Sequence, residues 1–288
     1  MNKKLLTQLV AIFIATQLIG LFVGIELVKE KSAGEIQPGI ITKDTEDPIN
    51  SIALIAYILV FTGVLLILIK YLKKWIGYIF KILELIVIFS TSIIVFSVFF
   101  LIFAPQTSAL VPFALSILLV VSRIAFRKSI WLKNVSSIIA VAGVGALIGV
   151  TLGIIPVILF LVALSVYDLI AVFYTKHMVV LAKAIVPQNL SFTYAFPTKE
   201  HTFELGTGDM VIPLTFAVSV LDLTSKQLVY PASLGAPILV LTGSLVGLIL
   251  TLEYSSKHIG KALPALPPQT IIMILMLGIS ALLGFIRF

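Results

Sequence analysis

Hydrophobic residues along this chain form nine long stretches, rather than the short alternating runs that are typical of strands. An apolar run of about 20 residues is long enough to cross the hydrocarbon core of a bilayer as an α-helix. The stretches lie roughly at 5–28, 51–69, 82–103, 108–126, 135–153, 154–175, 205–221, 231–252 and 264–286. A turn near Gly153 and Pro156 separates the fifth from the sixth. The pattern therefore predicts an all-α, polytopic membrane protein with nine transmembrane helices.

Composition agrees with this prediction, because 60% of the 288 residues are hydrophobic, only 11% are charged and the mean hydropathy is +1.18. Soluble domains carry about 25% charged residues. The first stretch, from Leu5 to Val28, is longer than the apolar part of a signal peptide, so we expect it to remain as a transmembrane helix. Since the chain contains no cysteine, disulfides, thiolate metal sites and cysteine nucleophiles are excluded.

The net charge of +7 is explained by the distribution of lysine and arginine between the two sides of the membrane. If the amino terminus lies in the cytoplasm, about three quarters of the 20 lysines and arginines fall in cytoplasmic segments, as the positive-inside rule expects. The carboxyl terminus then lies outside. We therefore expect a multi-pass protein of the cell membrane whose surroundings are the lipid bilayer, with no nucleic-acid partner.

Two acidic residues, Asp168 and Asp209, are predicted to lie within the membrane. A charge at mid-membrane costs about 2.5–3.5 kcal/mol even on the lenient insertion scale, so such residues usually have a partner or a task. Counted from the predicted cytoplasmic ends of their spans, Asp168 is about 12 Å deep and Asp209 about 8 Å deep. A third acidic residue, Glu84, is expected to snorkel to the cytoplasmic interface. Since the spans of Asp168 and Asp209 run antiparallel, their carboxylates can meet as a pair.

A carboxylate pair in a low-dielectric site shares one proton, because the two groups cannot both ionise. One can then act as general base on a water molecule while the other donates to a carbonyl oxygen. Gly206 and Gly208 flank Thr207 just before Asp209, and glycine permits unusual dihedral angles and close backbone approach. The last stretch begins at Pro264 with three prolines in five positions, which predicts a rigid, extended entry at the same level.

These residues carry a family resemblance. Leu164–Phe173, which contains Tyr167 and Asp168, resembles the YD segment of presenilins. Leu205–Asp209 resembles their LGxGD motif, and Pro264–Leu266 resembles their PAL motif. All three occur in the family's order. The chain is thus similar to presenilins and signal peptide peptidases, and most like an archaeal presenilin homologue; its lysine and arginine distribution favours the presenilin orientation.

The resemblance implies an intramembrane aspartyl endopeptidase that cleaves transmembrane protein substrates without a cofactor or metal. It implies that Asp168 and Asp209 are the catalytic pair. The residues that it places around them, to shape the site or bind substrate, are Tyr167, Gly206, Thr207, Gly208, Pro264, Ala265 and Leu266. On this interpretation, residues 1–153 form a scaffold of five helices within the single membrane domain, and 154–286 form a catalytic half with the cytoplasmic loop 176–204. An oligomeric assembly is compatible with the sequence.

A proton- or cation-conducting transporter is the alternative, since intramembrane carboxylates also mark ion pathways. Against it, the sequence has no internal repeat and the carboxylates gather near one membrane face. The histidines His177, His201 and His258 show no metal-ligand spacing, so we expect them in solvated loops.

Two further patterns concern packing and substrate binding. The glycines Gly145, Gly149 and Gly153, and the pair Gly243 and Gly247, are expected on helix-packing faces. The segments 191–196 and 201–205 alternate like strands, and the second could add a strand to an unwound substrate. On that hypothesis a proline in place of Phe203 would remove a pairing donor.

Overall fold

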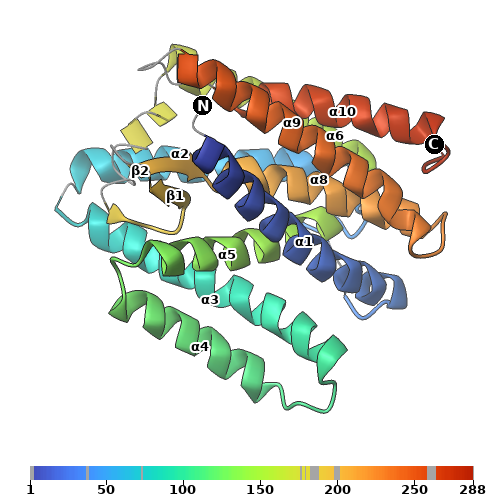
Figure 1. The fold of residues 1–288 in the computed structure, drawn as a ribbon, viewed down its shortest axis with the longest axis horizontal. Coiled ribbons are helices and arrows are strands. Elements are labelled where there is room, and N and C mark those ends of the chain that lie inside the picture. The colour runs from blue at the N-terminus through green and yellow to red at the C-terminus, as the bar shows by residue number, and fades with distance from the viewer. Residues whose placement is uncertain are drawn as a thin grey trace.

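The computed structural model describes residues 3–36, 39–72, 74–175, 177–178, 180–181, 188–197, 202–257 and 264–287. Within them the chain is mainly helical and has a single two-stranded sheet (Figure 1). The long helices are α1 (Lys3–Ala33), α2 (Ile49–Tyr71), α3 (Ile76–Phe103), α4 (Leu110–Ala125), α5 (Ile130–Thr151), α6 (Ile154–Leu169), α8 (Gly208–Ser225), α9 (Gly235–Lys257) and α10 (Leu266–Leu282). Each predicted apolar stretch is occupied by one of these helices, so the all-α prediction is confirmed.

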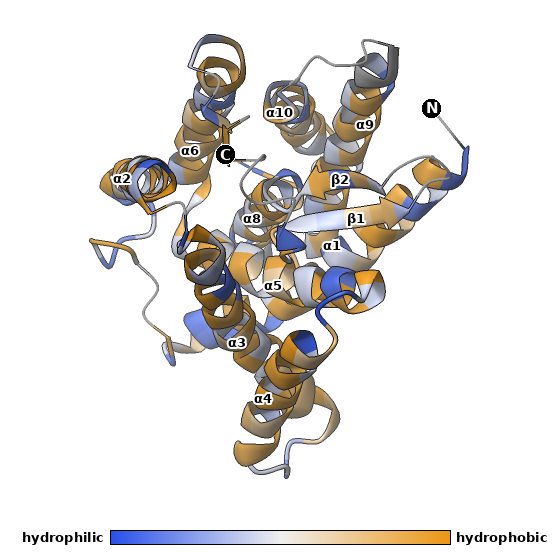
Figure 2. Ribbon diagram, turned by 90° about the vertical axis from the view of Figure 1, so that its left-hand side faces the viewer, coloured by the Kyte–Doolittle hydropathy of each residue, from blue (hydrophilic) through white to orange (hydrophobic). Residues whose placement is uncertain are grey.

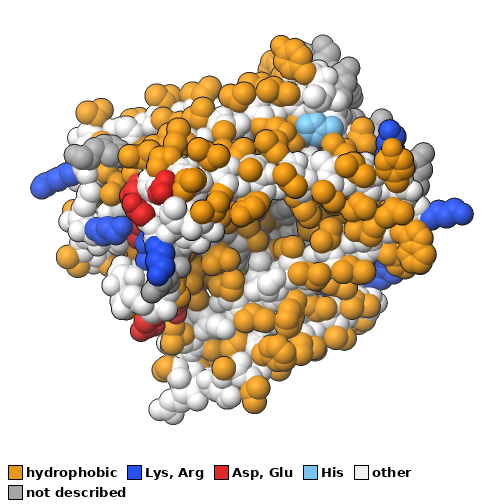
Figure 3. All heavy atoms as spheres, turned by 180° about the vertical axis from the view of Figure 1, so that it is seen from behind, with side chains coloured by type: hydrophobic (Ala, Val, Ile, Leu, Met, Phe, Trp, Pro, Cys, Tyr) orange, Lys and Arg blue, Asp and Glu red, His pale blue; other side chains and the backbone are white. Residues whose placement is uncertain are grey.

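Seven helices in the described part of the chain are long and apolar enough to cross a membrane, while α4 and α10 are shorter apolar helices. Figure 3 shows the consequence at the surface: hydrophobic side chains cover most of the face seen from behind, and charged side chains lie at its two ends. Aliphatic and aromatic side chains such as Val60, Phe103 and Leu118 are exposed along the helices. Such a surface is typical of a protein that contacts lipid.

Helix α8 lies in the middle of the bundle, between α1 and α5 on one side and α6 and α9 on the other (Figure 2). Its side chains reach into glycine positions on both neighbours. A Cβ atom at Gly20 of α1 or at Gly145 of α5 would come within 2.7 Å of Leu214. The expected packing role of Gly145 is therefore confirmed, as small residues let two helix backbones approach closely in a membrane.

The same arrangement repeats one turn further along α8, where Val218 lies between Gly24 of α1 and Gly149 of α5. Gly243 and Gly247 of α9 pack against α10 in the same way, which confirms the second predicted pair. Gly153 is different, and our prediction for it was wrong. It lies in the turn between α5 and α6, where a Cβ would meet the carboxylate of Glu46 rather than a helix.

A β-hairpin crosses the ends of α1, α5 and α8 (Figures 1 and 2). Its strands, β1 (Thr193–Pro197) and β2 (Thr202–Gly206), are antiparallel, with Thr193 opposite Gly206 and Phe196 opposite Phe203. The alternating pattern in these segments therefore predicted the strands, although His201 lies outside the described residues. The hairpin leads directly into α8, which begins at Gly208 rather than at residue 205, because the strand continues to Gly206.

Glu84 does not snorkel to the interface, so that prediction was wrong. It lies two turns inside α3, because this helix begins at Ile76, and its side chain is fully buried. The carboxylate instead receives a hydrogen bond from Nε of Arg123, at the end of α4, over 3.0 Å, and another from Lys81 over 2.8 Å. The contact with Arg123, from another helix, thus stabilises the charge of Glu84 inside the protein.

Candidate active site

Asp168 is the penultimate residue of α6, and its side chain is buried. The α-helix ends at Leu169 and continues as one π-helical turn, η1 (Ile170–Tyr174), in which the N–H of Thr175 reaches back to Ile170 O over 3.0 Å. π-Helical turns are rare and are found frequently at functional sites. The change of helical pitch directly after Asp168 therefore marks this position as unusual.

Asp209 lies in the first turn of α8, and its side chain is partly exposed. Negative charge is favourable at a helix amino terminus, where backbone N–H groups are unpaired. Thr207 fixes this turn to the hairpin, because both its N–H and its Oγ1 donate to Phe192 O, over 3.1 and 3.0 Å. Asp209 is close enough to Asp168 for the two carboxyl groups to interact electrostatically.

The two glycines beside Asp209 do not act through unusual dihedral angles, so that prediction was wrong. Neither Gly206 nor Gly208 has a positive φ. A Cβ at Gly206 would lie at an ordinary contact distance, 3.7 Å, from Oδ2 of Asp209. A Cβ at Gly208 would meet no atom within 4 Å. The glycines therefore leave open space around the Asp209 carboxylate.

The Pro264–Leu266 segment contacts Asp168 through its backbone. The N–H of Leu266 donates to Oδ2 of Asp168 over 3.3 Å, and the N–H of Ala265 hydrogen-bonds to the same carboxylate. The segment is not an extended entry, however. Helix α10 begins at Leu266, with Pro267 and Pro268 in its first turn, where a missing N–H costs nothing.

Tyr167 contacts a residue that follows η1. Its hydroxyl group hydrogen-bonds with Nε2 of His177 over 2.7 Å, and Nδ1 of His177 contacts Oγ1 of Thr175 over 2.6 Å. His177 is partly exposed, as a surface residue would be, but it also makes two specific contacts that we did not expect. Ten residues separate it from Tyr167, and no pattern in the sequence signals this contact. His258 lies outside the described residues.

The three segments that the sequence singled out thus meet at one end of the bundle. Two of them supply carboxylates and the third supplies backbone donors to one of these. In the described part of the chain, no three His, Asp or Glu side chains gather as a metal site would require. The arrangement resembles that of an acid–base pair whose protonation state is shared.

Comparison with known proteins identifies the family. The sequence pattern of the family described as signal-peptide peptidase, presenilin aspartyl protease matches residues 10–283. The chain belongs to this family. Its fold is similar to a solved structure titled as a presenilin family intramembrane aspartate protease in a C222 space group. The TM-score is 0.64 and the identity 22%, and 95% of each chain is covered.

A second solved structure, titled as a presenilin family intramembrane aspartate protease in a P2 space group, is 25% identical. The TM-score is 0.59, and the similarity covers 93% of this chain and 96% of the chain in that structure. A search of functionally curated proteins finds no match. The protein is thus a multi-pass intramembrane aspartate protease, that is, a hydrolase. The alternative of an ion transporter receives no support from these comparisons.

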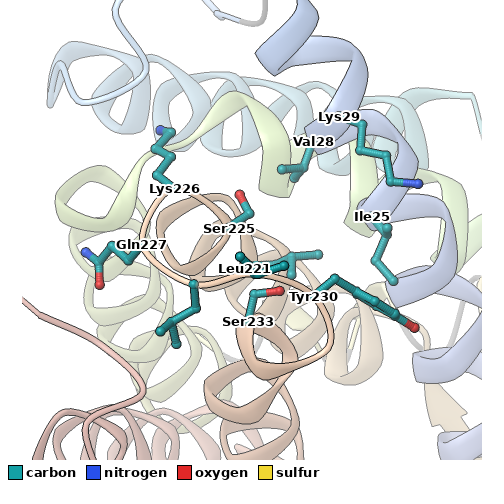
Figure 4. Close-up of a pocket in the computed structure, with 11 residues that line it drawn as sticks. Ile25, Val28, Lys29, Leu221, Ser225, Lys226, Gln227, Tyr230 and Ser233 are labelled. Atoms are coloured by element: carbon teal, nitrogen blue, oxygen red, sulfur yellow. The ribbon is translucent and has the colours of Figure 1, made fainter.

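A separate pocket of about 430 Å³ lies at the other end of α8 in this protease, between α1 and the segment that follows α8 (Figure 4). Lys29 and Lys226 are on its rim, but each lysine already forms an ion pair, with Glu26 and Asp222 respectively. The 16 residues from Asp209 to Ser225, which lines the pocket, correspond to about 24 Å of helix. We assign this pocket no part in the chemistry.

Proposed function

We propose that the chain hydrolyses peptide bonds within or near transmembrane segments of other proteins, using Asp168 and Asp209 as a pair that shares one proton. The observation that carries this proposal is the meeting of the two carboxyl groups at one end of α6 and α8, with two backbone N–H groups directed at Asp168. Those donors hold one carboxylate in a fixed orientation, which is what a reaction between positioned groups requires.

In the proposed mechanism one aspartate, ionised, accepts a proton from a water molecule as that water attacks the carbonyl carbon. The other, protonated, donates to the carbonyl oxygen, so neither the attacking water nor the carbonyl oxygen carries a full charge. The resulting gem-diol collapses as the C–N bond breaks: the aspartate protonated in the first step gives its proton to the leaving amine nitrogen, and the other takes back a hydroxyl proton as the carbonyl re-forms. The proton belongs to the pair, and we assign it to neither residue. The open space beside Gly206 and Gly208 gives the scissile bond access to Asp209.

We further propose nine membrane spans with a cytoplasmic amino terminus and an outer carboxyl terminus. The support is the distribution of lysine and arginine together with nine apolar helices in the described residues. On this orientation the active site opens to the cytoplasm. We also propose that residues 1–153 act as a scaffold and residues 154–286 as the catalytic half. In support, α1 and α5 of the scaffold pack directly against α8, which carries Asp209.

The test is cleavage of a single-span reporter protein by the purified chain in detergent. We expect Asp168→Asn and Asp209→Asn each to reduce cleavage to background, since neither variant can share a proton between two carboxyl groups. The matched control is Asp222→Asn, which changes a buried carboxylate at the far end of α8 and should retain activity. Cleavage by either active-site variant would contradict the proposed pair.

Strand addition to β2 remains our hypothesis for substrate binding. Ala195 of β1 uses both its N–H and its C=O to bind the side chain of Asn134, so the Ala195–Glu204 pair is not a hydrogen-bonded pair of the ladder. Because such pairs alternate, Phe203 bonds to β1, whereas the N–H and C=O of Glu204 face the outer edge. A proline at Phe203 would therefore break the hairpin, so this substitution cannot test the hypothesis.

The appropriate test alters the substrate. Synthetic substrates with a single N-methylated amide, moved one residue at a time past the cleavage site, lose one backbone donor each. If the substrate pairs with the outer edge of β2, alternate positions should lower the cleavage rate by about 2- to 10-fold, the value of one hydrogen bond, and intervening positions should not. Equal sensitivity at neighbouring positions would argue against strand addition.

A further inference from the structure

Glu84 and Arg123 form a fully buried ion pair at the end of the bundle where the active site lies. Burying both charges carries a large desolvation cost, and a well-packed hydrophobic pair of similar volume is often at least as stable. Stability alone therefore does not account for the pair. Its hydrogen bonds indicate what else it does.

The pair holds the segment that precedes β1. The N–H of Ser191 donates to Oε1 of Glu84 over 2.9 Å, and Nε of Arg123 donates to Oγ of Ser191 over 3.1 Å. The guanidinium also donates to the carbonyl oxygen of Asn189. From α5, Ser137 donates to Ser191 O over 2.9 Å. Three helices thus fix Ser191 in place through both its backbone and its side chain.

The residue after Ser191 is the one that holds the start of α8. The carbonyl oxygen of Phe192 accepts both hydrogen bonds from Thr207, which is the residue before Gly208 at the start of the helix. Asp209 follows Thr207 by two positions. The buried ion pair therefore holds Ser191, and the next residue, Phe192, accepts two hydrogen bonds from Thr207 in the turn that carries the proposed catalytic aspartate.

A second contact supports the same arrangement from β2. The Lys133 side chain, fully buried, forms an ion pair of 2.9 Å with Glu204, and Thr193 also hydrogen-bonds to that carboxylate. Both strands of the hairpin are thereby attached to fixed helices, one through Glu84 and Arg123 and the other through Lys133.

We propose that Glu84 and Arg123 are positioning residues, which set the location of the first turn of α8 and hence the placement of Asp209 relative to Asp168. This inference rests on the proposed function, because it assigns the ion pair a role in the same catalytic pair. Neither residue touches the reacting atoms. Their effect passes through Ser191, Phe192 and Thr207 to the carboxylate.

The chain provides its own control for this proposal. Lys31 of α1 and Asp222 of α8 form a second buried ion pair, with a distance of 2.8 Å and side-chain exposures of 13% and 3%. Each pair also has an additional lysine on its carboxylate: Lys81 on Glu84 and Lys226 on Asp222. Asp222, however, is 13 residues or about 20 Å along α8 from Asp209 and does not contact the hairpin.

The experiment compares two double variants, Glu84→Met with Arg123→Met and Lys31→Met with Asp222→Met. Methionine replaces both members of each pair with flexible apolar side chains, so neither member is left without the other. Lys81, 15% exposed, loses its carboxylate partner in the first variant, and Lys226, 54% exposed, loses its partner in the second. The melting temperature in detergent establishes that both fold. Cleavage of a single-span reporter then gives kcat and KM separately, and binding of a hydroxyl-containing mimic of the tetrahedral intermediate reports the geometry of the aspartate pair.

For the Glu84 and Arg123 variant we expect kcat to fall on the order of 10²-fold, the effect of a misplacement of about 1 Å in a reacting group. KM should stay within about twofold, and affinity for the mimic should fall in proportion to kcat. The Lys31 and Asp222 variant should keep its kcat. An unchanged kcat in the first variant, or equal losses in both that follow their melting temperatures, would overturn the proposal.

A milder variant provides a second test if the first does not fold. Ser137→Ala with Ser191→Ala removes the hydroxyl group of the segment and the α5 hydroxyl group that donates to it, and leaves the ion pair intact. We expect kcat to fall by about 2- to 10-fold at unchanged KM, and an unchanged kcat would overturn the proposal. These results can be distinguished from a failure of the proposed function. In that case the unmodified chain would be inactive, or the Asp209→Asn variant would be active.

Discussion

Helices α2 and α8 are the two extremes of this bundle. Among the seven candidate spans α2 is the most hydrophobic and α8 the least, yet 67% of the most apolar part of α8 is buried inside the protein and only 6% of that of α2. In a soluble protein the most hydrophobic helix would be the most enclosed. Here lipid replaces the protein core for α2, whereas α8 is enclosed by other helices (Figure 2).

The comparison between α2 and α8 also explains which helices can carry a catalytic carboxylate. A carboxylate on a helix surrounded by protein can be given partners, while one on a lipid-facing helix cannot. Asp209 lies on the enclosed helix, and Asp168 lies on α6, which packs against α8, α10 and α2. The proposed active site is therefore at the boundary between the tightly packed centre and the more loosely packed side of the bundle.

The largest effect should follow from filling a glycine contact of α8. In Gly149→Leu the new side chain would meet Val218 and, at 2.7 Å, the backbone oxygen of Thr215, which cannot move without moving the helix. We expect a loss of about 3 kcal/mol or more in the free energy of unfolding, measured by denaturation in detergent micelles. Gly63→Leu on α2, where a Cβ has no neighbour within 4 Å, should change stability by less than about 0.5 kcal/mol. Equal losses of unfolding free energy in the two variants would show that α8 is not more tightly packed than α2.

The next effect concerns the backbone donors at Asp168. Leu266 is the first residue of α10, a position that tolerates proline, so Leu266→Pro removes only the N–H that donates to the carboxylate and the leucine side chain. Losing a hydrogen bond to a charged group is worth about 1.5–3 kcal/mol, so kcat for reporter cleavage should fall about 10- to 100-fold. Leu266→Ala keeps the N–H and should lose far less; similar rates for the two variants would show that the donor is unimportant.

Much of this architecture could be predicted from the sequence, because the membrane imposes simple rules on helix length and charge. The apolar stretches predict the helices, and the turn at Gly153 separates α5 from α6 as expected. The rise per residue alone predicts that Asp168 and Asp209 lie at similar depths. The segments of the proposed site are therefore recognisable from their residues and spacing.

What the sequence could not provide are contacts between residues far apart in the chain. Glu84 was expected at the interface because its partner Arg123 is 39 residues away, on another helix. His177 was expected in solvent because nothing in its spacing predicts a bond to Tyr167. Gly206 was expected to adopt an unusual conformation, since a sequence cannot show whether a particular glycine has a φ value that other residues avoid.

A smaller effect should follow at the amino-terminal end of α2. The buried Asn50 side chain accepts hydrogen bonds from the N–H groups of Ile41 and Thr42 and donates to Asp44 O, so it anchors the preceding loop to this helix. We expect Asn50→Ala to lower the free energy of unfolding by about 2 kcal/mol and to speed amide exchange at Ile41 and Thr42. Reporter cleavage at a temperature where the variant is folded should be unchanged; a large loss of activity would show that α2 is coupled to the active site through this end.

The smallest effect is expected at Tyr167. Tyr167→Phe removes the hydroxyl group that bonds to His177, and also to Thr62, and leaves the ring packed against the hydrophobic core. Because one hydrogen bond contributes about 0.5–1.5 kcal/mol, kcat should fall about 2- to 10-fold if this contact steadies the turn after Asp168. Tyr57→Phe on the exposed side of α2 makes the same chemical change and should have no effect. His177→Phe removes this bond and also the contact with Thr175, so its loss should be at least as large. Adding Tyr167→Phe to His177→Phe should cause no further loss; additive losses would show that the two residues act separately.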